Sequence, residues 1–333
     1  MRLTVIIPTY RRPADLERCL GSLKEQERPA NEILLTVRDT DGETRGFLDR
    51  YEAGALPLRT VTVTTPGVIA AMNQGVSEAT GDIIALIDDD TAPFPDWLLR
   101  IEACFAEDVA GKVGGVGGRD WQPKYPGNSN PVGLVSWYGR FIGNHHLGSG
   151  EPRFVDVLKG ANCAYRAEPL KAVGFDERLA GGGAQVNWEL ALGLALRRAG
   201  WQLIYDPAVA VNHFIAQRFD NDLNNRGIFS ATGQTNAVHN ETLILWSEFS
   251  PIQRAVYLAW ALCIGTRGEP GLMQLARLAL VLRERFAVPK WRATLEGRLA
   301  GLKTWQNLRG KMRYPARPLP SPSSATQWQA VPA

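Results

Sequence analysis

The feature that most constrains the fold is an alternation of apolar runs with amphipathic segments in the first 87 residues. Apolar runs the length of a buried strand occupy residues 3–7, 32–37, 58–63 and 82–87. Segments with helical spacing of apolar residues lie between them, at 13–26, 42–54 and 67–81. Pro13 stands in the first turn of the first helix, and Gly81 is the expected cap of the third. The alternation predicts an α/β fold with a mostly parallel sheet covered by helices on both faces.

Polar loops follow three of these predicted strands. They read PTYRR at 8–12, RDTDGE at 38–43 and DDDTA at 88–92. The carboxyl ends of parallel strands meet at one edge of a sheet, and such folds bind ligands at that edge. We therefore expect the three loops to converge on one crevice.

The last of these loops holds three consecutive aspartates, Asp88, Asp89 and Asp90, directly behind a buried strand. Like charges packed at the mouth of a sheet are unfavourable unless a positive group lies among them. Oxygen ligands suit Mg²⁺, Ca²⁺ and Mn²⁺. The triplet predicts a divalent cation that bridges the protein to a diphosphate. A solvated turn that caps a helix at 95–107 is the alternative reading of the same residues.

The pattern changes in the second half of the chain. A glycine-rich strand is expected near 111–121, a strand and turn at 154–166, and a helix at 187–200 that ends at Gly200. From about residue 236 the spacing is helical throughout, and the last residues are rich in proline and serine. We predict a domain over 1–215, a helical region over 216–312 and a disordered tail over 313–333.

Composition narrows the functional classes. The net charge of +3 over 333 residues is too small to indicate a nucleic-acid partner. The four cysteines lie far apart with no C-x-x-C pair, which argues against a zinc site and against a disulfide framework. No run of about 18 uncharged apolar residues is present, so no spanning helix is expected. These features predict a cytoplasmic protein in a reducing compartment, with contact at the inner face of the membrane left open.

Four blocks of the sequence, in order, resemble glycosyltransferase family 2. They are VIIPTYRR, GVIAAMNQGVSEATGDIIALIDDD, KGANCAYRAEPLKAVGFDERL and NWELALGLALRRAGWQLIYDPAVAVNH. The resemblance covers about residues 1–215 and implies a Rossmann-like GT-A fold, with a nucleotide-binding half at about 1–110 and an acceptor half at about 111–215. It also implies a metal-dependent, inverting transfer from a UDP-, GDP- or dTDP-linked sugar to a hydroxyl of a glycan or lipid-linked acceptor. Polysaccharide, glycolipid or cell-envelope glycan synthesis is the implied setting.

The resemblance assigns roles to the donor side of the crevice. The positions that match nucleotide-sugar contacts are Pro8, Thr9, Tyr10, Arg11, Asp39, Asn73, Asp88 and Asp89. Within this set Asp39 matches the residue that reads the base, and Asp88 matches the ribose contact of the D-x-D motif. Asp90 matches the metal residue of that motif and His213 a further metal ligand, with Mn²⁺ or Mg²⁺ as the implied ion. Asp39 could instead be an ordinary turn residue, and His213 a structural histidine.

Glu189 matches the general base of the family. It stands at the first turn of a predicted helix, where the helix dipole favours the charged form of a carboxylate. A carboxylate there can take a proton from a sugar hydroxyl as that oxygen attacks. The alternative is a first-turn acid that only stabilises its helix.

Two positions depart from the family pattern. Met72 stands where the family has an arginine, and Trp188 stands in an acidic position beside Glu189. Trp188 keeps open a catalytically silent carbohydrate-binding or scaffold protein. A nucleotidyltransferase is the rival enzyme, although PTYRRPAD lacks the glycine-rich loop that it needs after the first strand.

The predicted C-terminal helices set arginine and lysine beside leucine and tryptophan. Helices of this composition can lie on a membrane surface and present a lipid-linked acceptor. The same pattern also fits a helical subdomain packed on the sheet or a homodimer interface, and the sequence does not choose among these.

Overall fold

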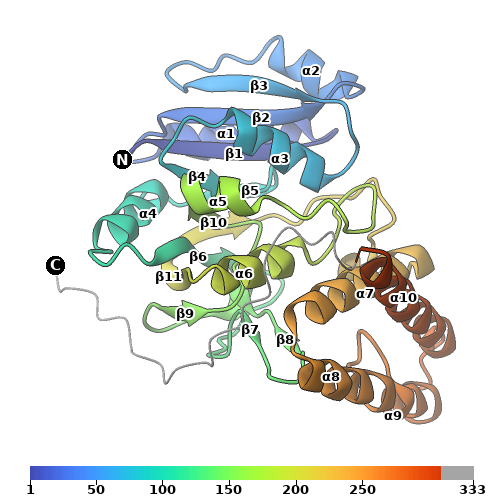
Figure 1. Ribbon diagram of the computed structural model, residues 1–333. Coiled ribbons are helices and arrows are strands. Elements are labelled where there is room, and N and C mark those ends of the chain that lie inside the picture. The colour runs from blue at the N-terminus through green and yellow to red at the C-terminus, as the bar shows by residue number, and fades with distance from the viewer. Residues whose placement is uncertain (309–333) are drawn as a thin grey trace.

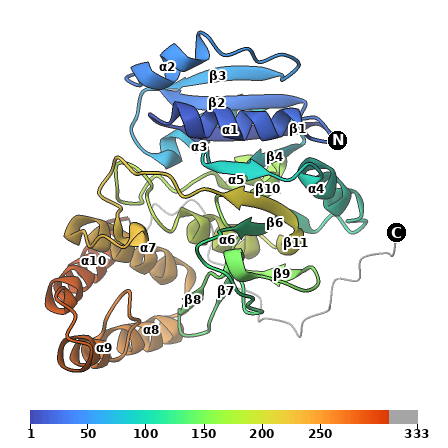
Figure 2. The ribbon, with the colours of Figure 1, turned by 180° about the vertical axis from the view of Figure 1, so that it is seen from behind.

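The computed structural model describes residues 1–308 of the chain. A nine-stranded sheet forms its centre in the order β3-β2-β1-β4-β10-β6-β11-β5, and β9 also pairs with β11 (Figure 1). Helices lie in front of the sheet and behind it, as Figures 1 and 2 show from opposite sides. A separate group of helices extends from the side on which the first strands end.

The first half follows the predicted alternation. Its strands pair in parallel and are β1 (Leu3–Thr9), β2 (Glu32–Arg38), β3 (Leu58–Val63) and β4 (Ile83–Leu86). The helices between them are α1 (Pro13–Lys24), α2 (Gly42–Leu48) and α3 (Val68–Glu78). Helix α2 ends earlier than predicted, at Leu48, and exposed Asp49 and Arg50 follow it.

The end of α3 differs from the prediction. The helix ends at Glu78, and Ala79 is already extended, so Gly81 is not its cap. Gly81 instead donates its N–H to Thr4 Oγ1 at 2.9 Å, and a Cβ at this position would lie 2.7 Å from the Thr4 nitrogen. The glycine is needed for close approach to β1, a requirement that spacing along the chain does not reveal.

The second half completes the sheet. Its elements are β5 (Thr91–Pro93), α4 (Trp97–Ala106), β6 (Val113–Trp121), β7 (Leu134–Val135), β8 (Phe141–Ile142), β9 (Arg153–Val155), β10 (Cys163–Arg166), α5 (Ala167–Val173), α6 (Trp188–Arg198) and β11 (Gln202–His213). Strand β10 runs antiparallel between β4 and β6, whereas β6 and β11 are parallel. The segment at 154–166, predicted as a strand and turn, thus holds two strands with different partners in the sheet.

Separate apolar cores lie on the two faces of the sheet. The core under α3, α5 and α6 takes Ile6 and Leu34 from the strands. The core under α1 and α4 takes Val5 and Ile7. Successive strand residues therefore enter opposite cores, which explains why the strands are apolar throughout.

The C-terminal region is helical, as predicted. It consists of α7 (Ala231–Glu248), α8 (Pro251–Cys263), α9 (Leu272–Ala276), a π-helical turn (Arg277–Val281) and α10 (Ala287–Leu308). Helices α7 and α10 pack closely at Gly297 and Gly301, where added Cβ atoms would lie 2.6 Å from backbone oxygens of α7. None of the helices within residues 1–308 is long and apolar enough to cross a membrane. The proposed tail at 313–333 lies outside the described residues, and the domain division stays a prediction.

Candidate active site

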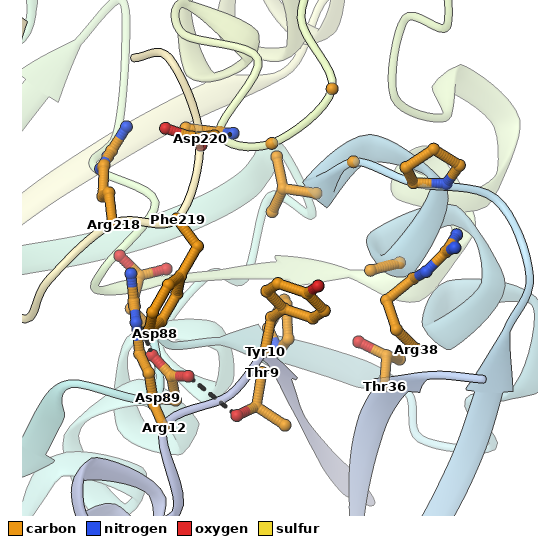
Figure 3. A pocket seen from close by; sticks show the side chains of 18 of the residues that line it. Thr9, Tyr10, Arg12, Thr36, Arg38, Asp88, Asp89, Arg218, Phe219 and Asp220 are labelled. Carbon is orange, nitrogen blue, oxygen red and sulfur yellow. Dashed lines mark hydrogen bonds and ion pairs between the residues drawn. The ribbon is translucent and has the colours of Figure 1, made fainter. Parts of the chain in front are cut away.

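A cavity of about 340 Å³ opens where β1, β2 and β4 end, as the convergence of loops predicted (Figure 3). All three loops contribute to its wall, together with residues 182–184 and the segment after β11. Pro8, Thr9 and Tyr10 are among its lining residues. Tyr10 meets Phe219 edge to face, with 6.2 Å between ring centroids. These partly exposed rings give the cavity an aromatic wall against which a planar base can pack.

The three aspartates point in different directions. Asp89 turns inward, where it accepts hydrogen bonds from Thr9 Oγ1 at 2.8 Å and Arg12 Nη1 at 2.9 Å. Burial raises the pKa of Asp89 to about 7, although the charge of Arg12 opposes that shift. The side chain thus ties the β1–α1 connection to the end of β4. Asp88 and Asp90 on either side of it remain directed toward other partners.

Asp88, Asp90 and His213 form a cluster that fits a metal ion. One ligand atom from each lies within 4.8 Å of the others, although the three residues come from β11 and the loop after β4. Asp90 Oδ2 accepts the Ala216 N–H at 2.8 Å. Asp90 Oδ1 is buried, has no hydrogen-bond partner within residues 1–308, and lies 3.4 Å from His213 Nε2. A buried, unsatisfied carboxylate oxygen beside another carboxylate and an imidazole is the chemistry that Mn²⁺ or Mg²⁺ would satisfy.

Asp120 orients the histidine. Its Oδ2 lies 3.2 Å from His213 Nδ1, and Gln122 Nε2 donates to the same oxygen at 2.6 Å. Burial lowers the pKa of His213, but the contact with Asp120 and the nearby charge of Asp90 together outweigh burial and raise it to about 9. Such a carboxylate behind the ring directs Nε2 toward the cluster. The sequence interpretation missed Asp120, which lies near the end of β6.

Arginines face the acidic residues across the cavity. Arg12, Arg218 and Arg226 all line it, and Arg226 Nη2 lies 3.9 Å from Asp90 Oδ2. Burial and the charge of Arg218 lower the pKa of Arg226. The sequence interpretation assigned none of the three. Met72, at the position where the family has an arginine, is buried in the core, so positive charge reaches the cavity from other segments.

Glu189 lies at the first turn of α6, as predicted, and is not among the residues that line this cavity. Its Oε1 accepts hydrogen bonds from Lys159 Nζ at 3.2 Å and from the Gly160 N–H at 3.4 Å. Burial is the largest single influence on the pKa of Glu189 and raises it, but the charge of Lys159 and the hydrogen bonds that the carboxylate accepts together outweigh burial, so the net shift is downward. The side chain is therefore held as a carboxylate. The charges of Lys159 and Glu189 also act on the pKa of Asp88, so both groups lie within electrostatic reach of that aspartate.

Trp188 has a packing role. It is 7% exposed and meets Phe175 edge to face at 5.3 Å. A Cβ on Gly160 would lie 2.3 Å from its ring. The tryptophan thus packs α6 onto the turn that carries Lys159, and an acid in its place would be buried among apolar groups.

Other predicted residues lie away from the cavity wall. Arg11 has a φ of 58°, and its side chain pairs with Glu43 at 2.7 Å, while Arg12 enters the cavity instead. Asp39 is exposed and pairs with Arg38 at 3.4 Å, and it is Arg38 that lines the cavity.

Asn73 faces a separate hollow beside α5. It donates to the Phe175 carbonyl at 3.2 Å and accepts the Phe175 N–H at 3.0 Å. The structure does not bring Arg11, Asp39 or Asn73 together with the aspartates in this cavity. Their assignments stay predictions.

Comparisons with known proteins agree with this geometry. The family model described as glycosyl transferase family 2 matches residues 4–173. Glycosyltransferase AglE of Haloferax volcanii is 25% identical over 190 residues, which cover 56% of this chain and 59% of that protein. The uncharacterized glycosyltransferase YibD of Escherichia coli is 33% identical over 108 residues, or 32% of this chain and 31% of that protein. The chain therefore spans less than two thirds of the curated relatives that it matches.

Solved structures share the fold. Mannosyltransferase PcManGT from Pyrobaculum calidifontis, in complex with GDP-Man and Mn²⁺, aligns with a TM-score of 0.56 and 20% identity, covering 93% of this chain and 79% of that one. S. aureus TarS 1–349 in complex with UDP-GlcNAc aligns with a TM-score of 0.57 and 14% identity, covering 95% and 93%. The likeness confirms the predicted GT-A fold.

The packing of Trp188 yields a stability prediction. Trp188→Ala should lower the free energy of unfolding by about 3–5 kcal/mol, the usual effect of emptying a core aromatic site. Trp188→Phe should lower it by much less, because the ring still fills part of the space beside Phe175. Urea denaturation of both variants measures the difference. Equal, small losses would show that the tryptophan is not needed for packing.

Proposed function

The chain belongs to glycosyl transferase family 2, and we propose that it is a metal-dependent inverting glycosyltransferase. It would move a sugar from a nucleoside diphosphate to an acceptor hydroxyl. The observation that carries the proposal is the cluster of Asp88, Asp90 and His213 beside several arginines at the carboxyl edge of the sheet. Carboxylates and guanidiniums placed together in one cavity suit a ligand that carries both a dication and a diphosphate.

Asp88, Asp90 and His213 would hold the ion, with Asp120 fixing the ring of the histidine. A bound Mn²⁺ or Mg²⁺ would stabilise the negative charge of the departing diphosphate. The fit rests on the buried Asp90 Oδ1, which accepts no hydrogen bond from residues 1–308, and on the mixed oxygen and nitrogen donors.

Arg226 and Arg218 would bind the phosphates. Both lie in the segment after β11 and line the cavity. Arg226 Nη2 lies 3.9 Å from Asp90 Oδ2, which is too far for a hydrogen bond. Guanidinium groups form paired hydrogen bonds with phosphate oxygens. This segment would replace the charge that Met72 does not supply.

Glu189 would act as the general base. Its carboxylate would take the proton of the acceptor hydroxyl as the oxygen forms a bond to the anomeric carbon of the donor. The bond from that carbon to the diphosphate breaks, and its electrons leave with the diphosphate. Attack from the opposite face inverts the anomeric centre. Lys159 would keep Glu189 charged before each transfer.

The donor is supported as a nucleotide sugar by the complexes of the structural neighbours with GDP-Man and UDP-GlcNAc. A screen of nucleotide sugars would identify the base and the sugar of this chain's own donor. We propose a glycan or lipid-linked acceptor, in polysaccharide, glycolipid or cell-envelope glycan synthesis. Of the rivals, a nucleotidyltransferase is less well supported, because the β1–α1 connection carries Tyr10, Arg11 and Arg12 in place of a glycine-rich loop.

The metal assignment predicts the behaviour of Asp90→Asn. The amide can still accept the Ala216 N–H, but it loses the charge that a dication needs. Mn²⁺-dependent binding of a nucleoside diphosphate should fall by more than about 100-fold, beyond the range expected for losing an outer-shell partner. Calorimetry with and without Mn²⁺ measures it, and exposed Asp49→Asn is the matched control. Undiminished Mn²⁺-dependent binding by Asp90→Asn would remove Asp90 from the metal site.

The phosphate assignment predicts that Arg226→Gln weakens nucleoside-diphosphate binding. Losing a hydrogen bond to a charged group corresponds to about 10- to 100-fold in affinity. Exposed Arg50→Gln carries the same change of charge outside the cavity and should bind normally. If both variants bound alike, the phosphates would have to be held by other residues.

The base assignment predicts that Glu189→Gln retains donor affinity and loses transfer by about 100-fold or more, the scale of general base catalysis. The matched control is Glu168→Gln, because Glu168 is also a first-turn acid, on α5. Single-turnover transfer to a supplied acceptor measures the rate. A loss shared by both variants, or by neither, would exclude Glu189 as the base. Asp176 and Glu177 would then be tested next.

A further inference from the structure

The segment from α9 to the start of α10 exposes a cluster of large apolar side chains. We call them the apolar tip: Leu272, Met273, Leu280, Val281, Leu282, Phe286 and Val288. Leu280 and Val281 are 76% and 72% exposed, although Leu278 just before them is fully buried. Single exposed apolar residues are ordinary, but a cluster of this kind marks an interaction surface. Figures 1 and 2 both show α9 at the corner of the helical region farthest from β1–β3.

Helical geometry gathers these residues on one side. Positions 272, 273, 276 and 280 fall within one face of a helix, and all four are exposed. The chain then turns at Arg283, whose φ of 51° lies in the left-handed region. This turn leaves Leu280, Val281 and Leu282 at the end of the helical segment, with no later helix residue to cover them.

The segment that carries the apolar tip is basic. Residues 265–308 contain eight arginines and lysines but only three acidic residues. Two of the acids are engaged, because Glu284 pairs with Arg267 and Glu269 with buried Arg298. The exposed arginines around the tip are Arg277, Arg283, Arg285 and Arg292. No ion pair joins any of these four to a carboxylate within the part of the chain that the structure describes.

We propose that the apolar tip and its four arginines form a docking surface for an anionic lipid bilayer. Apolar side chains enter the boundary between headgroups and acyl chains, and arginines beside them pair with anionic headgroups. An anionic bilayer complements both the apolar side chains and the positive charge of this surface. A nucleic acid would use the arginines but would leave Leu280 and Val281 in water.

A second copy of the chain fits this surface less well. A two-fold interface sets the same patch against itself. The four arginines of each copy would then face those of the other across a low-dielectric contact, which is unfavourable. An anionic bilayer would cover the same apolar area, and its headgroups would attract the arginines instead of repelling them.

The surface is connected to the candidate active site through stacked rings. Phe286 of the tip stacks on Phe229, with 5.2 Å between centroids. Phe229 lies three residues after Arg226, which lines the donor cavity. Through Phe286 the tip thus contacts the segment that also carries Arg226. This position suits an acceptor with a lipid tail, a deepening that rests on the proposed function.

The experiment is co-sedimentation of the full chain with vesicles of neutral phosphatidylcholine and with vesicles that also contain phosphatidylglycerol. We expect binding to the anionic vesicles that falls as salt is raised. Val281→Glu should weaken the partition coefficient by more than about tenfold. Arg277→Gln combined with Arg285→Gln should weaken it by roughly 30-fold, from about 1 kcal/mol per charge. Val109→Glu is the matched control, since Val109 is a 98% exposed valine in the nucleotide-binding half.

The outcomes separate the surface from the enzyme. Equal recovery with neutral and anionic vesicles at low salt, or equal effects of Val281→Glu and Val109→Glu, would overturn the proposal. So would a concentration-dependent dimer that Val281→Glu dissociates in the absence of vesicle binding. Nucleoside-diphosphate binding by Val281→Glu should equal that of the unchanged chain, because Val281 lies outside the cavity. Failure of the docking surface would thus leave the donor site intact, and failure of the donor site would leave vesicle binding intact.

Discussion

The candidate active site depends on one buried carboxylate, Asp89. By accepting hydrogen bonds from Thr9 and Arg12, it joins the end of β4 to the connection between β1 and α1. Asp89 and Asp90 lie in the turn that follows β4. Asp89 is turned inward in this turn, whereas ligand atoms of Asp88 and Asp90 lie close to His213. One internal ion pair both closes the sheet edge and arranges the two outer acids of the triplet.

Much of the fold could be predicted because its strands are buried on both faces. A strand that enters two cores must be apolar throughout, and such runs are visible in any one sequence. The antiparallel insertion of β10 could not be predicted in this way. Residues 154–166 follow one another closely in the chain, yet β9 pairs with β11 while β10 lies between β4 and β6. The turn in this segment was predicted, but strand pairing depends on contacts that are distant in sequence, and the sequence of 154–166 does not show which strands they are.

The position of a residue relative to a predicted strand also explains which site residues could be identified from the sequence and which could not. The aspartate triplet was visible because it directly follows a predicted strand. Asp120 also lies at the carboxyl end of a strand, β6, and applying that criterion to GGRDW would have selected it. Arg218 and Arg226 had no such signal, because their segment has neither helical nor strand periodicity. Their position depends on how the chain returns over the cavity after β11.

Trp188 stands where the family has an acidic residue, and this difference changes the electrostatics around the proposed base, Glu189. Two adjacent carboxylates in a buried site raise the pKa of at least one of them. With tryptophan at 188, Glu189 lacks an adjacent acid, and its principal charged partner is Lys159, whose own pKa is raised mainly by Glu189. A lowered pKa weakens Glu189 as a proton acceptor, but it keeps the carboxylate ionised in a site where burial favours the neutral form. Packing also helps to keep Lys159 near Glu189. The Trp188 ring lies where a side chain on Gly160 would be, and it packs the turn that carries Lys159 against α6. The departure from the family pattern therefore fits a base whose charge is maintained by a lysine.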